Sequence, residues 1–203
     1  FASQAGMPAR QAAAVADTPP ALPAPEANDA APAQASAPPT ADQVETATSF
    51  FHDGEAAMQR GDYAQAASYF QHALVDTPQN GGAVLLLAQA LFAMGQHRDA
   101  AGAVQMAMQL LAEEDWGMVV KHFDQLYTDR TAYGKQLQAL EAARDKQTDD
   151  PALRFLLGYH FGFLGHREPA LRELDKAIAL EPQDQGSKKL REMFAATEAR
   201  PIA

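Results

Sequence analysis

From about residue 42 onward, apolar residues recur three and four positions apart, which places them on one face of an α-helix. Runs of β-branched residues, which favour strands, are missing from the same region. Proline is sparse there, whereas the preceding segment is rich in it. The pattern therefore predicts an all-α domain over residues 42–203.

Glycine and alanine repeat through this domain at a near-constant interval. Gly61 and Gly95 are 34 residues apart, and Gly165 follows Gly61 by 104 residues, which is three such periods plus two residues. A repeat of this length is the signature of stacked supersecondary units. Three further columns share the register: Ala66, Ala100 and Ala170; Ala73, Ala107 and Ala177; and Phe70, Val104 and Leu174.

Each repeat unit reads as a helical hairpin. We expect the three glycines to adopt the left-handed conformation that ends a first helix, and the alanines to let paired helices approach closely. Short polar residues that accept backbone N–H bonds mark the helix starts. The expected N-caps are Asp62 with Gln65 as its capping-box partner, Asp42 with Glu45, and Asp150 before Pro151.

This pattern resembles the tetratricopeptide repeat over residues 47–184, and the resemblance implies a right-handed α-solenoid of antiparallel hairpins. The four units are 47–80, 81–114, 117–150 and 151–184, with the two extra residues at Asp115-Trp116, and a closing helix is expected over 185–199. The first unit carries Gly54, Ala57, Gly61-Asp62-Tyr63, Ala66, Phe70, Ala73 and Pro78, and the fourth carries Leu157-Gly158, Phe161, Gly165, Ala170, Leu174, Ala177 and Pro182.

Two features depart from the repeat pattern. The third unit is degenerate, with Thr131 at the glycine position and Gln136 at an alanine position. In the fourth unit, Arg154 stands where the family often has a large aromatic residue. The registration of the third unit is therefore the least regular part of the predicted solenoid.

Residues 1–41 are rich in proline and alanine and hold Phe1 as their sole aromatic residue. They carry too little bulky apolar surface to offset the entropy of ordering, so we expect a disordered linker. A passive linker, a tether and a ligand for proline-binding domains are three uses of such a segment. Because the chain begins with Phe1 rather than Met, we expect a piece of a longer product; an envelope-anchored domain and a cytoplasmic fragment are both consistent with it.

Composition and motifs exclude several functions. The net charge is −10, which disfavours nucleic acid and anionic membranes as partners, and the chain lacks cysteine and any apolar run long enough to span a bilayer. Nucleophile, P-loop, dinucleotide and metalloprotease motifs are missing, and the six histidines do not converge at ligand spacing. We therefore expect no catalysis, cofactor or metal.

The resemblance implies a concave surface, lined by the first helix of each unit, that binds a peptide or a partner helix. Lys121 is the sole basic lining residue and Glu55 is acidic, which disfavours a ligand held by its terminal carboxylate. The alternatives are that the aromatic residues are core or are covered by the closing helix, and that the module acts by self-association. The expected lining is Phe51, Glu55 and Met58; Leu85, Gln89 and Phe92; Lys121, Gln125 and Thr128; and Phe155, Tyr159 and Phe163.

Overall fold

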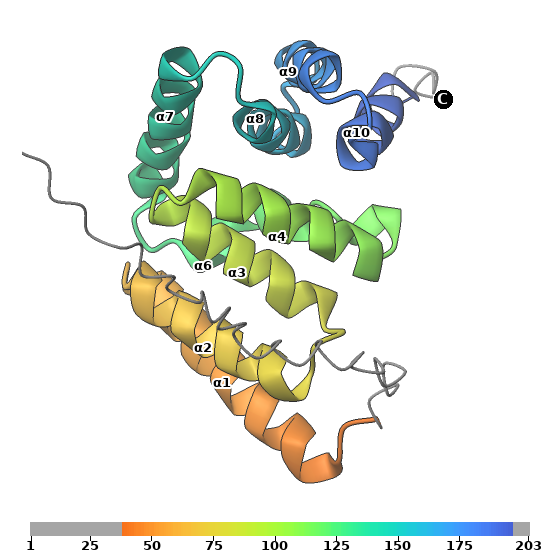
Figure 1. Cartoon of the computed structure of the whole chain (residues 1–203). Coiled ribbons are helices and arrows are strands. Elements are labelled where there is room, and N and C mark those ends of the chain that lie inside the picture. The colour runs from red at the N-terminus through yellow and green to blue at the C-terminus, as the bar shows by residue number, and fades with distance from the viewer. Residues whose placement is uncertain (1–37, 197–203) are drawn as a thin grey trace, which may run out of the picture. The chain divides into compact units, whose positions relative to one another are not determined.

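The structure, a computed structural model, describes residues 38–196, and this part of the chain is entirely helical (Figure 1). Residues 1–37 of the expected linker and residues 197–199 of the expected closing helix lie outside the described residues. The elements are α1 (Ala41–Gln59), α2 (Tyr63–Asp76), α3 (Gly81–Ala93), α4 (His97–Leu110), η1 (Glu113–Asp115), α5 (Met118–Lys121), α6 (Phe123–Leu126), α7 (Arg130–Lys146), α8 (Pro151–Phe163), α9 (Arg167–Leu180) and α10 (Gln185–Ala196).

The three repeating glycines end the first helix of three hairpins, as predicted. Gly61, Gly95 and Gly165 have φ values of 77°, 77° and 86°, a conformation that a side chain disfavours. After α1, the N–H of Gly61 donates to the Met58 carbonyl, and the N–H of Asp62 donates to the Ala57 carbonyl. This paired pattern satisfies carbonyls at the helix end and reverses the chain within two residues.

The N-caps at Asp62 and Asp150 are as predicted, but the Asp62 N–H donates to the Ala57 carbonyl rather than to the Gln65 side chain, so the predicted capping box there is incomplete. Asp62 accepts from the N–H of Gln65, and Asp150 accepts from the first turn of α8 behind Pro151. The predicted N-cap at Asp42 was wrong by two residues, because α1 begins at Ala41. Its N-cap is Thr40, which forms a reciprocal capping box with Gln43 in place of the expected Asp42 and Glu45.

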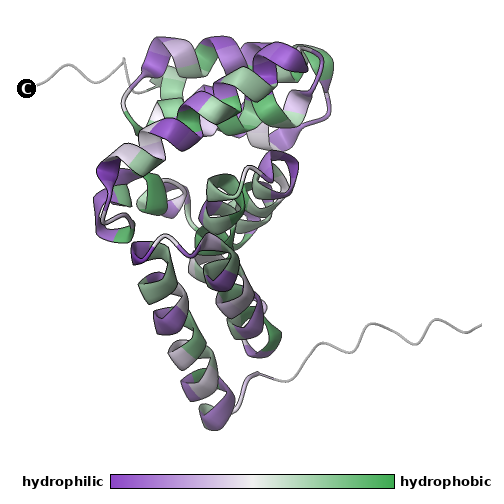
Figure 2. Cartoon of the chain, turned by 90° about the vertical axis from the view of Figure 1, so that its left-hand side faces the viewer, coloured by the Kyte–Doolittle hydropathy of each residue, from purple (hydrophilic) through white to green (hydrophobic). Residues whose placement is uncertain are grey.

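Small residues allow the helices of each hairpin to pack closely. The columns at Ala66, Ala100 and Ala170 and at Ala73, Ala107 and Ala177 are fully or almost fully buried. Figure 2 shows hydrophobic and hydrophilic residues together on most helices, as expected where each helix buries one face. The contacts within α1–α2, α3–α4 and α8–α9 are the most extensive in the described chain.

The order of stacking departs from the order of the sequence. Helix α2 packs on α3, as consecutive hairpins do, but α4 then packs mainly on α8, the first helix of the fourth unit (Figure 1). Across this junction, Gln105 Nε2 of α4 donates to Asp184 Oδ1 in the α9–α10 turn at 3.0 Å. The third unit is therefore not a layer between the second and the fourth.

The third unit is irregular where its first helix was expected. Residues 113–126 form the short helices η1, α5 and α6, and side-chain caps are missing at all three starts. The expected turn at Thr131 is also absent, since α7 begins at Arg130 with Asp129 as its N-cap. Short, uncapped helices with little apolar periodicity do not build a regular hairpin layer.

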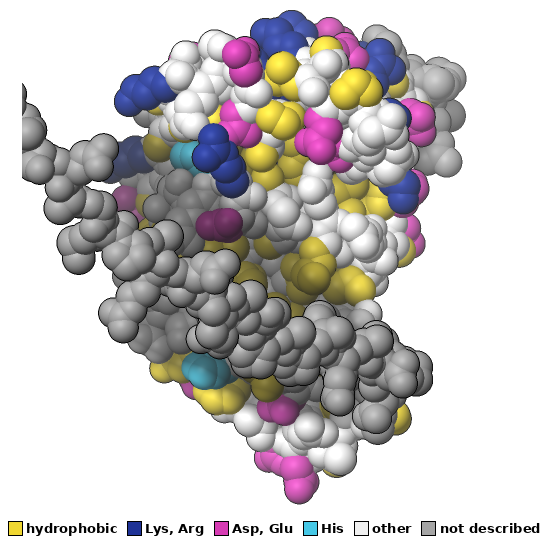
Figure 3. Space-filling model, viewed as in Figure 1, with side chains coloured by type: hydrophobic (Ala, Val, Ile, Leu, Met, Phe, Trp, Pro, Cys, Tyr) yellow, Lys and Arg dark blue, Asp and Glu magenta, His cyan; other side chains and the backbone are white. Residues whose placement is uncertain are grey.

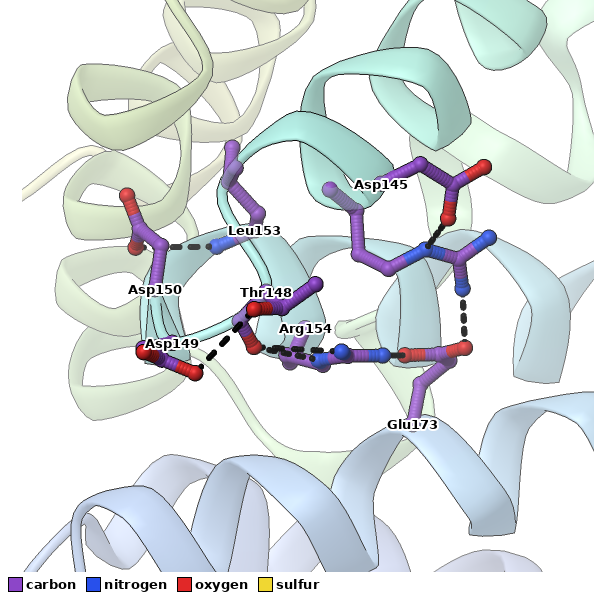
Figure 4. Close-up of polar contacts among 8 residues, drawn as sticks. Asp145, Thr148, Asp149, Asp150, Leu153, Arg154 and Glu173 are labelled. Carbon is purple, nitrogen blue, oxygen red and sulfur yellow. Dashed lines mark hydrogen bonds and ion pairs between the residues drawn. The ribbon is translucent and has the colours of Figure 1, made fainter.

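A buried ion network ties α7 to the fourth hairpin. Arg154 donates through Nη1 to Glu173 Oε2 at 2.7 Å and through Nη2 to the Thr148 carbonyl at 3.1 Å (Figure 4). Arg144 of α7 donates to the other oxygen of the same Glu173 carboxylate. Arg154 thus replaces the expected aromatic residue with a buried charge whose three nitrogen atoms each have a hydrogen-bond partner, as a buried charge requires.

His160 of α8 is a second buried polar group at the junction. Its Nδ1 lies 2.8 Å from the Tyr133 hydroxyl of α7, and its ring is 4.2 Å from that of Phe92 of α3. Burial, with a further contribution from His97, lowers the pKa of His160 to about 3. Nε2 of each histidine is buried without a hydrogen-bond partner among the described residues, so this junction requires neutral imidazoles.

The first prediction concerns close packing at Gly158. A Cβ there would lie 2.5 Å from Leu174 Cγ, whereas a Cβ at Gly134 of α7 meets no atom within 4 Å. We expect Gly158→Ala to lower the free energy of unfolding by about 1–3 kcal/mol. Gly134→Ala, the matched control, is expected to raise it by about 0.5–1 kcal/mol. Urea unfolding measures both, and equal effects would contradict the packing.

The second prediction concerns acid. Since the folded chain holds His160 neutral, its contribution is present above the unfolded pKa of 6.5 and is lost as the pH falls toward 3. The expected loss is about 1.4 kcal/mol per pH unit below 6.5. His160→Phe is therefore expected to flatten the fall in unfolding free energy between pH 7 and 5. The exposed-histidine control His72→Gln is expected to follow the wild-type curve; a parallel curve for His160→Phe would refute this account.

Candidate groove

A groove of about 640 Å³ lies between α1, the beginning of α3 and the short helices α5 and α6. This volume is within the range of clefts that hold ligands and peptides. Its three walls come from the first, second and third units. The groove therefore occupies part of the surface on which the sequence placed the binding site.

One stripe of α1 forms the longest wall. Its members recur at helical spacing and run for about 22 Å at 1.5 Å per residue. They are Val44, Ala47, Thr48, Phe51, His52, Glu55 and Gln59. The facing residues are Thr77, Asn80, Gly82 and Leu86 around the start of α3, and Met118, Val119, His122, Gln125 and Leu126 of α5, α6 and the residue between them.

Large apolar side chains are exposed on opposite walls of the groove. Val44 of α1 is 44% exposed and Met118 of α5 is 36% exposed. Phe51, which lies between these two residues in the sequence, is half-buried, and its ring is edge-on to that of Phe70. Together these residues form an apolar surface. At Val44 and Met118, no helix of the described chain covers it.

The groove is closed where α1 ends. Gln59 Nε2 donates to the Gln125 carbonyl at 3.1 Å, and Thr128 Oγ1 donates to the Gln59 carbonyl at 2.7 Å. These two bonds join positions 66 and 69 residues apart in sequence. They fix the spacing between α1 and α6, so an occupant has access only along the preceding turns of α1.

Three of the expected lining residues lie in the groove: Phe51, Glu55 and Gln125. Thr128 is at its closed end and is used in the bond to Gln59. Lys121 does not line it, and its Nζ lies 5.3 Å from the centre of the Phe163 ring. Phe163 is half-buried with its ring against that of Phe194, so neither residue joins Phe51.

Six other expected lining residues are in the core. Each of them is 1–3% exposed: Met58, Leu85, Gln89, Phe92, Phe155 and Tyr159. Their contacts are with other parts of this chain. For these positions, the structure agrees with the alternative that the expected lining residues belong to the core. Among the expected lining residues, those that remain accessible along the groove belong to its α1 and α6 walls.

The third unit covers much of the expected concave strip. Gln89 Nε2 donates to the Tyr127 hydroxyl at 2.7 Å, and Tyr159 donates to the Trp116 carbonyl at 2.8 Å. The rings of Phe92 and Tyr133 are 5.8 Å apart. Residues 116–133 do not form a layer of the stack. They pack instead on the concave side of α3 and α8.

The closing helix covers the end of the same strip. The rings of Phe163 and Phe194 of α10 are 5.2 Å apart, and a Cβ at Gly162 would overlap the Phe194 ring. Phe155 lies beside Gly186 at the start of α10. The fourth unit is therefore packed on both sides.

Several groove residues were not predicted. Val44 and Ala47 precede Phe51 on the same helical stripe, so their spacing was sufficient to find them. Helical spacing could not predict Met118 and His122 as groove residues, because their position depends on the interruption of the first helix of the third unit. The sequence signal for that break was its lost glycine and alanine columns.

The groove lining offers apolar contact, hydrogen bonding, the carboxylate of Glu55 and the imidazoles of His52 and His122. Among the described residues, no group of three or more His, Asp or Glu side chains is placed to hold a metal ion. Burial raises the pKa of Tyr127, Tyr133 and Tyr159 above the usual value, and these hydroxyls serve the core. No helix within residues 38–196 has both the length and the hydropathy to cross a bilayer.

Paired antiparallel helices with glycine-ended first helices define a helical-hairpin repeat protein. The tetratricopeptide repeat family model matches residues 57–120, from the end of α1 to α5. Over these residues the chain is similar to the tetratricopeptide repeat family, whose fold supports a protein–protein interaction module. No curated protein sequence matches it.

Solved structures of tetratricopeptide repeats align with the chain at low identity. The Sgt2 domain from Aspergillus fumigatus is 19% identical, with 81% of this chain and 88% of that one covered and a TM-score of 0.34. A thermophilic repeat protein from Thermus thermophilus is 19% identical, with 76% and 84% covered and a TM-score of 0.34. The first repeat domain of Spaghetti (RPAP3), bound to an HSP90 peptide, is 14% identical, with 77% and 96% covered and a TM-score of 0.36.

The third prediction concerns the closed end of the groove. Thr128→Val removes the hydroxyl that donates to Gln59 while keeping the branched shape. We expect α6 amides to exchange faster with deuterium and the free energy of unfolding to fall by about 1 kcal/mol. Thr131→Val, which alters a local cap bond on α7, is the control and is expected to leave α6 exchange unchanged. Unaltered exchange in α6 for Thr128→Val would show that this bond does not close the groove.

Proposed function

We propose that this protein is a non-catalytic interaction module that binds a peptide or a partner helix in the groove between α1 and α5–α6. The observation that carries the proposal is the pair of exposed apolar residues, Val44 and Met118, on facing walls of one groove. Apolar anchors from a partner would bury against them and displace water.

The shape of the groove supports a short linear segment. The α1 stripe is about 22 Å long, which matches about four turns of helix or about seven residues of extended chain. Polar residues along the walls, including Thr48, Asn80 and Gln125, offer hydrogen bonds to a peptide backbone. Apolar anchors at the centre with polar contacts at the rim are the usual arrangement of an interface.

Self-association is the second use of such a surface. A second copy would present an acidic chain to an acidic chain, because the net charge is −10. Repulsion between copies opposes this mode at low salt. Light scattering over a range of concentrations separates the two modes, since a groove used by another protein leaves the chain monomeric.

The fourth prediction tests the groove with two matched methionine variants. Peptides are selected from a displayed random library against the full chain, and their affinities are then measured for Met118→Ala and Met106→Ala. Met118 lies in the groove, whereas Met106 of α4 is 55% exposed outside its lining. We expect Met118→Ala to weaken binding about fivefold or more and Met106→Ala to leave it within about twofold.

Circular dichroism confirms that both variants remain helical. If the selected peptides lose the same affinity with either variant, or with neither, they bind elsewhere and the groove is not the site. If no peptide is selected and the chain self-associates through Met118, the second mode replaces the first.

A further inference from the structure

We propose that the groove selects a cationic partner: a segment with apolar anchors and Lys or Arg residues beside them. This inference rests on the proposed function, since it assumes that the groove is the docking site, and it adds the chemistry of the occupant. It is carried by the charges on and around the groove walls.

Among the described residues, the lining holds one carboxylate, two histidines (His52 and His122) and neither Lys nor Arg. Glu55 is on the α1 stripe, half-buried, with an oxygen 3.4 Å from His52 Nδ1. Lys121 is the last residue of α5, but its ammonium group lies over the Phe163 ring and not in the groove lining. An anionic ligand would therefore meet Glu55 without a Lys or Arg counter-charge in the groove.

The acidic character extends over the surrounding surface. Residues 38–96, which supply α1 and α3, hold six acidic residues and one basic residue, Arg60. Arg60 is the C-cap of α1, next to the closed end where Gln59 meets α6. The acidic residues are Asp42, Glu45, Asp53, Glu55, Asp62 and Asp76.

Basic residues are concentrated in the other half of the described chain. Residues 97–196 hold thirteen Lys and Arg residues and sixteen Asp and Glu residues, so their charges nearly balance, whereas acidic residues outnumber basic ones six to one in residues 38–96. On the face shown in Figure 3, Lys and Arg gather toward the top, where Figure 1 has α7 to α10, and Asp and Glu are the charged residues visible at the lower end. Negative charge is therefore least compensated in the part of the described chain that supplies α1.

This charge distribution acts on selectivity and association rate. Lys or Arg beside the anchors of a partner would lie within the ~8 Å over which surface charges act at physiological salt. Complementary charges accelerate encounter and penalise wrong partners, while the apolar anchors supply most of the affinity. Two features of the partner follow: apolar residues to fill the groove and positive charge at its edges.

The experiment compares three synthetic peptides of about 14 residues, which as a helix equal the length of the α1 stripe. One combines Leu on one face with Lys on the other, the second replaces Lys with Glu, and the third replaces Leu with Ser and keeps Lys. Fluorescence anisotropy with the full chain measures each affinity at two salt concentrations. We expect the Leu/Lys peptide to bind about tenfold or more tightly than either of the others.

Two charge reversals of equal size test whether the groove itself is responsible. Glu55→Lys changes the α1 stripe, and Glu181→Lys changes an exposed residue after α9, outside the groove lining. We expect Glu55→Lys to weaken the Leu/Lys peptide about fivefold and Glu181→Lys to change it less than about twofold. Equal weakening by both variants would mean a general attraction to an acidic protein and would overturn the inference.

The outcomes also separate this inference from the proposed function. If the Leu/Glu peptide binds as tightly as the Leu/Lys peptide and Met118→Ala weakens it, the groove is a docking site without selection for cations, and only this inference fails. If Met118→Ala weakens neither Leu-containing peptide, the groove assignment fails, and this inference fails with it.

Discussion

The packing of α4 on α8 determines the rest of this structure. Leu85, Val104 and Leu156 meet at this junction, and the Gln105–Asp184 hydrogen bond joins its far end. Once the fourth hairpin packs on the second, the third unit has no layer to occupy. Its short helices cover the concave side of α3 and α8, and what remains accessible is the groove along α1. The surface on which we propose that a partner binds is thus set by a contact between helices that are not neighbours in the repeat order.

Regular units were predictable because their determinants are local. The left-handed glycine at position 61, the Asp62 and Asp150 caps and the alanine columns specify hairpins within short stretches of sequence. The groove lining was harder to predict than the hairpins, because the exposure of a lining residue depends on which other residues pack over it. Phe92 and Tyr159 have the spacing of a concave surface, but Tyr133 and the Trp116 carbonyl cover them. The degenerate repeat positions of the third unit predicted that it would be irregular, but they did not predict where its helices would pack.

Polar groups at the junction explain how α7 of the third unit is held against the fourth hairpin. Arg154 and Arg144 share the Glu173 carboxylate, and Tyr133 meets His160. These pairs join α7 to the fourth hairpin through directional bonds, which apolar packing alone does not provide. The first hairpin, by contrast, carries six acidic residues and one basic residue, so the α1 wall of the groove belongs to a predominantly acidic hairpin.

The central claim is that the fourth hairpin follows the second directly. Gln109 of α4 and Gln185 of α10 are exposed and line the same small cleft, and the chain has no native cysteine, so a double cysteine variant at these positions can be cross-linked specifically. The reagent is a bifunctional maleimide no longer than the ~10 Å between neighbouring helix axes. The structure predicts an efficient intramolecular cross-link in the folded chain. A regular four-layer stack would insert a hairpin about 20 Å thick between the two positions, and a folded protein that fails to cross-link would contradict the account.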